Sequence, residues 1–174
     1  DESESRGLGD VYKRQVLSAN HTVLATEGNL NNHIGVPLTL LRLTAAHSHA
    51  IIEMGANHLK EIAFLCEIAQ PTYGLITNVG KAHLEGFGSE EGVFQGKTEL
   101  YDFIEKKDGL IFVNEDDHKL FFAIGNVAHI AFEPSEYSIV QEQPTLKLVR
   151  QNIEIPTQLV GTYNKENIVA ALSI

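Results

Sequence analysis

The feature that most constrains the fold of this chain is an alternation between short apolar runs and longer amphipathic runs. The short runs are HTVLAT (21–26), HAIIEM (49–54), YGLITNV (73–79), LIFVN (110–114) and VAHIAF (127–132). Helix-like segments separate most of them, at 37–46, at 58–70 and from Ser89 to about Lys107. This strand–helix–strand order predicts an α/β fold built on a doubly wound, mainly parallel sheet.

Local signals support these helices. Segment 58–70 places its apolar residues mostly on one broad face, and Pro71 follows it as a stop signal. Pro37 is suited to be the first residue of the preceding helix, because its missing N–H is not needed there. Ser89 has the side chain of an N-cap. A further short helix is expected near 116–123.

The pattern changes from about residue 137. Three short alternating runs, YSIVQEQ, TLKLVR and NIEIPTQLV, are divided by Pro144 and Pro156. They predict a small antiparallel β segment attached to the α/β core. A last helix is expected to open near Asn164.

Residues 1–15 differ from the remainder of the 174-residue chain. The run DESESRGLGDVYKRQ is polar and has neither a helical nor a strand period. We therefore expect an unstructured leader there, one that need not be native to the domain. Residues 16–174 are then expected to form one partial α/β domain.

Composition excludes several classes of protein. Thirteen basic and 23 acidic residues give a net charge of −10, which disfavours general binding to nucleic acids or anionic membranes. The apolar runs are too short to span a bilayer, and the first residues lack the apolar core of a signal peptide. The single cysteine, Cys66, cannot form an internal disulfide, and we expect it to be a buried structural thiol. A reducing, cytoplasmic compartment fits these features.

Polar groups follow three of the predicted strands, where ligands bind in α/β folds. Glu53 ends one strand, His83 follows another, and the loop EGNLNNHIG follows the first. These groups converge on one crevice if the strands are parallel neighbours. Glu53 and His83 could then bind Mg²⁺ or Mn²⁺. The alternative is that Glu53 caps a helix and His83 makes a loop hydrogen bond.

Other candidates leave two interpretations open. Lys97 is either a solvated lysine or a site residue, and the adjacent Gly96 would permit close approach of another backbone or a ligand. The amides of Asn29, Asn31 and Asn32 either hold a polar ligand or form an ordinary turn cluster.

Asn164 and Asn167 share one face of the last helix, where they either contact a ligand or act as a cap and a surface residue. The sequence has no GxSxG nucleophile elbow, and its cysteine lacks a nucleophile signature. Covalent catalysis by serine or cysteine is therefore not expected.

Four stretches together resemble the Mur ligase family, over about residues 16–174. They are TEGNLNNHIGVPLTLL (26–41), EMGANHLKEI (53–62), ITNVGKAHLEGFGSEEGVFQGKTEL (76–100) and GTYNKENIVAA (161–171). The first and third are most similar to the MurF type, which adds D-alanyl-D-alanine to UDP-N-acetylmuramoyl-tripeptide. The resemblance implies an ATP-dependent ligase of peptidoglycan synthesis, in which ATP phosphorylates a substrate carboxylate and an amine attacks the acyl phosphate.

The resemblance also implies roles for individual residues. Glu53 and His83 would be Mg²⁺ ligands, and Lys97 would be carbamoylated and support a second Mg²⁺. His83 and Lys97 are thus the implied catalytic residues. Carbamoylation makes chemical sense, because it converts an ammonium into an anion that a hard cation prefers.

Two asparagine groups match binding motifs of the family. The loop with Asn29, Asn31 and Asn32 would face the UDP-sugar substrate. Asn164 and Asn167 would contact the adenine nucleotide of ATP. The residue before Asn164 differs from many relatives, because Tyr163 stands where they carry histidine.

The sequence also departs from the family by an absence. The family's phosphate loop, of the GTNGKT kind, should precede Val16, but the unrelated leader stands there. The amino-terminal and carboxy-terminal domains of the family are not recognisable either. We therefore expect a central-domain fragment that is inactive alone. The alternatives are another Mur ligase, a folylpolyglutamate-synthase relative, or a non-catalytic binding module.

Overall fold

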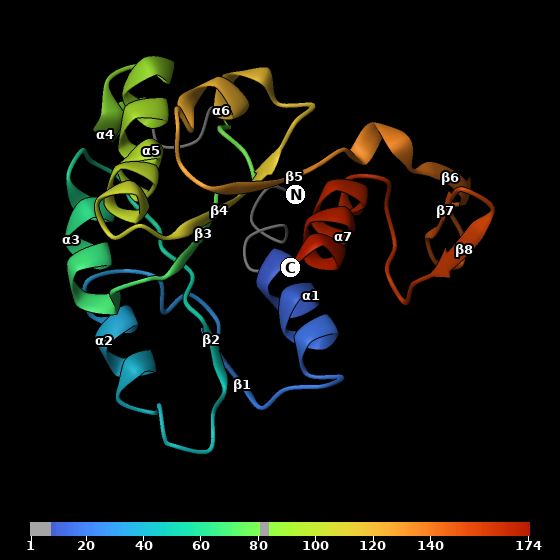
Figure 1. Cartoon of the computed structure of the whole chain (residues 1–174), viewed down its shortest axis with the longest axis horizontal. Coiled ribbons are helices and arrows are strands. Elements are labelled where there is room, and N and C mark those ends of the chain that lie inside the picture. Colours follow the sequence, from blue (N-terminus) through green and yellow to red (C-terminus); the bar gives the residue numbers. More distant parts are fainter. Residues whose placement is uncertain (1–7, 81–83) are drawn as a thin grey trace.

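The computed structural model describes residues 8–80 and 84–174 (Figure 1). In its first half the elements are α1 (Leu8–Leu17), β1 (Val23–Ala25), α2 (Gly35–Leu40), β2 (His49–Ile51), α3 (Glu61–Ala69), β3 (Tyr73–Leu75) and α4 (Leu84–Phe87). The second half contains α5 (Glu90–Lys106), β4 (Leu110–Asn114), α6 (His118–Ala123), β5 (His129–Phe132), the 3₁₀ turn η1 (Pro134–Glu136), β6 (Ser138–Gln141), β7 (Lys147–Arg150), β8 (Ile153–Pro156) and α7 (Asn164–Ser173).

The strands confirm an α/β fold with parallel pairing and a small antiparallel sheet. β1 and β2 pair in parallel, with Val23 opposite His49. β3, β4 and β5 form a second parallel sheet in that order. β6, β7 and β8 form an antiparallel sheet, which projects to one side of the molecule in Figure 1. Among the described residues, the parallel strands thus form two sheets. β2 is an edge strand of the first sheet, and β3 is an edge strand of the second.

The expectation of an unstructured leader over residues 1–15 is wrong for its second part. Residues Leu8–Leu17 form α1, which packs along α7 and also contacts β1 (Figure 1). Residues 1–7 lie outside the described part of the chain. The short helix has a weak intrinsic signal, and its stability comes from packing against an element about 150 residues further on.

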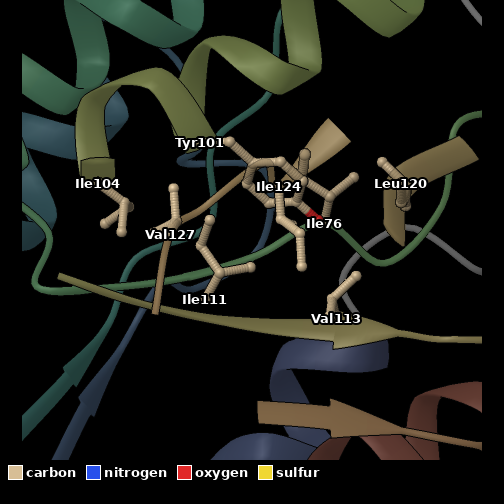
Figure 2. Close-up of a cluster of buried hydrophobic side chains, with 8 residues drawn as sticks. All are labelled: Ile76, Tyr101, Ile104, Ile111, Val113, Leu120, Ile124 and Val127. Atoms are coloured by element: carbon tan, nitrogen blue, oxygen red, sulfur yellow. The ribbon is translucent and has the colours of Figure 1, made fainter. Parts of the chain in front are cut away.

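Alternate residues of β4 build two cores on opposite faces of its sheet. Ile111 and Val113 point to a cluster with α5 and α6 (Figure 2). Phe112 points to the other face and packs with Ile168 and Val169 of α7. This period of two places α5 and α6 on one face and α7 on the other. The run LIFVN is therefore a buried strand, as its sequence predicts, and the structure places it between β3 and β5.

Figure 2 shows the first of these clusters, in which the ring of Tyr101 lies among aliphatic side chains. Tyr101 is only 2% exposed, and its hydroxyl has no hydrogen-bond partner among the described residues. Burial, with a smaller contribution from Asp117, raises the pKa of this hydroxyl far above its usual range. Tyr101 therefore serves the core as a neutral aromatic group.

Two further expectations are confirmed by local geometry. The Oγ of Ser89 accepts a hydrogen bond from Gly92 N at 3.0 Å, as an N-cap of α5 should. Cys66 is fully buried, and its thiol donates to Met54 Sδ at 3.8 Å. Burial raises the pKa of this thiol to about 12, so it is an inert structural group.

The expectation that Pro37 is the first residue of its helix is wrong. Pro37 is the third residue of α2, because α2 begins at Gly35.

The start of α3 is held by a carboxylate from α5. Glu99 accepts hydrogen bonds from Lys60 N at 2.5 Å and from Ala63 N at 3.0 Å. Lys60 has a left-handed backbone, with φ of 71°, and its side chain does not cap the helix. The Glu99 carboxylate therefore satisfies two helix-terminal N–H groups and lies at the positive end of the α3 dipole.

Replacing Glu99 by alanine tests this cap. We expect Glu99→Ala to lower the free energy of unfolding by about 1–3 kcal/mol, because two N–H groups, of which that of Ala63 is partly buried, lose a charged acceptor. Urea denaturation measures this change, and amide hydrogen exchange should accelerate at Lys60 and Ala63. Glu105→Ala, an exposed carboxylate on the same helix, is the matched control. Equal stability of the two variants would contradict the cap.

Candidate functional site

The carboxyl end of β2 places Glu53 beside the loop that follows β1. The Oγ of Thr26 accepts a hydrogen bond from Glu53 N at 2.9 Å, and Thr26 N donates to Ile51 O at 3.0 Å. The side chain of Asn31 reaches the same carboxylate, with its Nδ2 donating to Glu53 Oε1 at 3.1 Å. The parallel pairing of β1 and β2 therefore brings Glu53 and the amide-rich loop together, as the sequence predicts.

The three asparagines of this loop have different surroundings. Asn31 is half-buried and contacts Glu53. The Oδ1 of Asn32 accepts from Ile34 N and Gly35 N, both at 3.0 Å, and so supports the start of α2. Asn29 is exposed. The amide of Asn31 thus holds Glu53, and the amide of Asn32 caps the start of α2.

Lys97 projects from α5 to the segment that follows β3. Its Nζ donates to Asn78 O at 2.7 Å, and the side chain is half-buried. Burial lowers the pKa of Lys97 from its usual value. Since burial disfavours the ammonium form, this amine is neutral over a wider pH range than an exposed lysine. Such a lysine is a candidate nucleophile, and not merely a solvated charge.

Close packing at two glycines joins the segments that carry these residues. A methyl group on Gly86 of α4 would overlap Asn57 O, in the segment that follows Glu53. A methyl group on Gly96 of α5 would overlap the ring of Phe87. The contacts link the Glu53 segment to α4, and α4 to the turn of α5 that carries Lys97. The group that closely approaches Gly96 is thus the side chain of Phe87, and not another backbone or a ligand as expected.

His83, the other expected metal ligand, lies outside the described residues. Its chain neighbour Leu84 begins α4. Within the described part of the chain, no group of three or more histidine, cysteine, aspartate or glutamate side chains could hold a metal ion. Glu53 is therefore a single carboxylate held at the end of a strand, and any metal there needs further ligands.

A small cavity lies beyond the end of β3. It has a volume of about 200 Å³ and is lined by Val79, Gly80, Glu90, Asp117 and Lys119. The lining includes both charges, and Asp117 is already used as the N-cap of α6, accepting from Leu120 N at 3.1 Å. No local sequence pattern indicates this cavity, because its residues are brought together by the packing of α5 against α6.

The asparagines of α7 lie on the other face of the β3–β4–β5 sheet from α5. Asn164 is 2% exposed, and its Nδ2 donates to Val160 O at 2.8 Å. Its Oδ1 is buried and has no partner among the described residues. Asn167 is half-buried, and Tyr163 is 63% exposed. Asn164 is therefore a buried side chain whose Nδ2 is hydrogen-bonded and whose Oδ1 is unpaired within the described residues.

Comparison with known proteins identifies the family. The family model described as "Mur ligase middle domain" matches residues 11–174. The chain belongs to the Mur ligase family. The match includes residues 11–15 of the expected leader, which lie within helix α1.

Named Mur ligases are similar over most of this chain. A UDP-N-acetylmuramoyl-tripeptide–D-alanyl-D-alanine ligase of Haemophilus influenzae is 41% identical in an alignment of 162 positions, which covers 87% of the chain and 35% of that ligase. The enzyme of the same name from Escherichia coli is 34% identical over 91% of the chain and 38% of its own length. The chain thus spans little more than a third of these relatives.

Solved structures have the same fold. The crystal structure of MurF from Acinetobacter baumannii matches with a TM-score of 0.80 and 28% identity, over 95% of this chain and 39% of that one. MurF from Thermotoga maritima in complex with ADP matches with a TM-score of 0.77 and 24% identity, over 94% of this chain and 41% of that one. The second similarity shows the fold alone.

This Mur ligase domain has no helix, in the part that the structure describes, that is long and apolar enough to cross a membrane. Its expected site residues come from separate elements, and Glu53 with Asn31 is the pair that the structure joins directly. Sequence reasoning missed Gly86 and Glu99, which fix how these elements pack. For a glycine or a glutamate on a helix surface, the neighbouring sequence does not indicate which distant residue it will contact.

Replacing Gly96 by alanine tests the packing beside Lys97. Alanine favours a helix interior, but its methyl group would overlap Phe87. We expect Gly96→Ala to lower the free energy of unfolding by about 1–3 kcal/mol, as overpacking does, and to shift the ring resonances of Phe87. Urea denaturation and NMR measure these effects. Gln95→Ala, at an exposed neighbour on the same helix, is the control, and equal or greater stability of Gly96→Ala would refute the contact.

Proposed function

We propose that this chain is the middle-domain part of an ATP-dependent UDP-N-acetylmuramoyl-tripeptide–D-alanyl-D-alanine ligase, which acts in peptidoglycan synthesis. The observation that carries this proposal is the 41% identity to an enzyme of that name, over 87% of the chain. Relatives from Escherichia coli, Synechocystis and Bacillus subtilis, at 32–35% identity, bear the same name. Through that pathway the protein would serve cell-wall biogenesis, cell shape and division, in the cytoplasm.

The proposed reaction joins two substrates in two steps. ATP transfers its γ-phosphoryl group to the terminal carboxylate of UDP-N-acetylmuramoyl-tripeptide, which yields an acyl phosphate and ADP. The amine of D-alanyl-D-alanine then attacks the acyl carbon. A peptide bond forms, phosphate leaves with the electron pair of the broken C–O bond, and the amine loses a proton. The part of the protein described here would hold and orient the groups that react.

Glu53, His83 and Lys97 are the residues that we propose to hold two Mg²⁺ ions. The fit is supported by the donor chemistry of Glu53, whose carboxylate is oriented by Asn31 and has oxygens of the kind that Mg²⁺ prefers. When bound, Mg²⁺ neutralises the charge of the phosphoryl group being transferred. Glu53 would bind Mg²⁺ from the end of a strand, and Lys97 would bind it from α5.

Lys97 would act as a carbamate. Its neutral amine attacks CO₂, a C–N bond forms and one proton leaves, so that an ammonium site becomes an anion. Burial supports this chemistry, because it lowers the pKa of Lys97 and increases the neutral fraction that reacts. The hydrogen bond to Asn78 O keeps the amine near the end of β3.

Two sets of asparagines would contact the substrates. We propose that Asn164 and Asn167 contact the adenine nucleotide, and the unused, buried Oδ1 of Asn164 supports such a contact. The loop with Asn29, Asn31 and Asn32 would face the UDP-sugar substrate. The amino-terminal and carboxy-terminal domains of the parent enzyme would complete both sites.

Carbamoylation of Lys97 is directly measurable. We expect the chain, incubated with ¹³CO₂ and Mg²⁺ at mildly alkaline pH, to show a carbamate ¹³C resonance. Because a lowered pKa leaves more neutral amine at a given pH, Lys97 should react at lower pH than exposed lysines do. The resonance should vanish in Lys97→Arg and persist in Lys106→Arg, on the exposed face of α5. Persistence of the signal in Lys97→Arg would exclude this site.

Phosphate release tests the proposed function. The parent protein is mixed with ATP, UDP-N-acetylmuramoyl-tripeptide and D-alanyl-D-alanine, and we expect release only with all three. Glu53→Gln and Lys97→Ala should lower kcat by about 100-fold or more, the usual loss when charge stabilisation of the transition state is removed. The 174-residue chain alone should not exceed background. No turnover by the parent, or another preferred amine, would overturn the assignment.

A further inference from the structure

The contact between Asn31 and Glu53 is supported from both sides. The Nδ2 of Asn31 donates to Glu53 Oε1 at 3.1 Å across 22 positions of sequence. The backbone of Asn31 is held as well, because Gly55 N donates to Asn31 O at 2.8 Å. A fixed main chain limits the amide of Asn31 to the few positions that its rotamers allow, which makes it suitable for positioning a neighbour.

Gly55 provides the space that the Asn31 side chain occupies. A methyl group at Gly55 would lie 2.9 Å from Asn31 Nδ2 and 3.0 Å from its Cγ. Gly55 is not among the glycines with positive φ, so its backbone would accept alanine. The glycine is therefore required by the amide beside it and not by backbone conformation.

The backbone of Glu53 is fixed by the same loop. Thr26 accepts from Glu53 N and, through its own N–H, donates to Ile51 O. The carboxylate of Glu53 is thus held at its main chain by Thr26 and at one oxygen by Asn31. An ionised carboxylate has about four acceptor positions, so an amide donor and a cation can bind the same group.

We infer that Asn31 is a positioning residue, which orients the Glu53 carboxylate for a divalent cation. The inference rests on the proposed role of Glu53 as a Mg²⁺ ligand. In metal sites, groups that hydrogen-bond to a ligand fix its orientation, and their loss weakens metal affinity by about 10- to 100-fold. Asn31 acts on the substrate through Glu53, whereas Asn29, which is exposed, remains the amide open to a ligand of the loop.

Titration of the chain with Mn²⁺, followed by the EPR signal of the free ion, tests this inference. We expect Asn31→Ala to weaken Mn²⁺ binding by about 10-fold or more. Gly55→Ala retains the asparagine but displaces its amide, and should weaken binding in the same direction. Asn126→Ala, an exposed amide on the turn between α6 and β5, should leave it unchanged. Urea denaturation of each variant measures stability separately from affinity.

Glu53→Gln distinguishes failure of the inference from failure of the proposed function. If Glu53→Gln loses Mn²⁺ while Asn31→Ala and Gly55→Ala bind it as tightly as the unaltered chain, the positioning role is overturned and the metal role of Glu53 stands. Reduced stability of Asn31→Ala with unchanged affinity would likewise overturn it in favour of a purely structural contact. If the unaltered chain binds no Mn²⁺, or Glu53→Gln binds it equally well, the metal role itself is overturned.

Discussion

The candidate site depends on how closely separate pieces of backbone approach one another. Gly86 lets α4 rest against the segment that follows β2, and Gly96 lets the ring of Phe87 rest on α5. Glu99 adds two hydrogen bonds from α5 to the start of α3. These contacts are between elements, so they set the distance between the strand end that carries Glu53 and the helix that carries Lys97. The side-chain chemistry of the site is secondary to this packing.

Helix α5 connects the site with the core. Its inner face packs Tyr101 and Ile104 against β4, while Lys97 and Glu99 face the neighbouring elements. A lysine whose pKa is lowered by burial costs free energy at neutral pH. The apolar packing of the same helix offsets that cost, because one rigid element carries both functions. The arrangement is consistent with the general rule that reactive groups are positioned by elements whose stability comes from elsewhere.

Much of the fold could be predicted from local pattern. The buried run 110–114, the cap at Ser89 and the antiparallel segment after residue 137 all have signals within a few residues of themselves. Helix α1 could not be predicted in this way. Its sequence is polar and short, and its helical form is stabilised by α7 at the far end of the chain. Parallel pairing of β1 with β2, in contrast, followed from the strand–helix–strand order.

The sequence by itself determined which residues are chemically suited to the site: a carboxylate at a strand end, a lysine beside a glycine, and an amide-rich loop. Only the tertiary structure decided their partners. Asn31 binds Glu53 across 22 positions and Glu99 caps α3 across 36 and 39 positions. The physical reason is the distance along the chain over which each interaction acts. Propensity and periodicity act between near neighbours along the chain, whereas a hydrogen bond between distant segments exists only once the sheets and helices have packed.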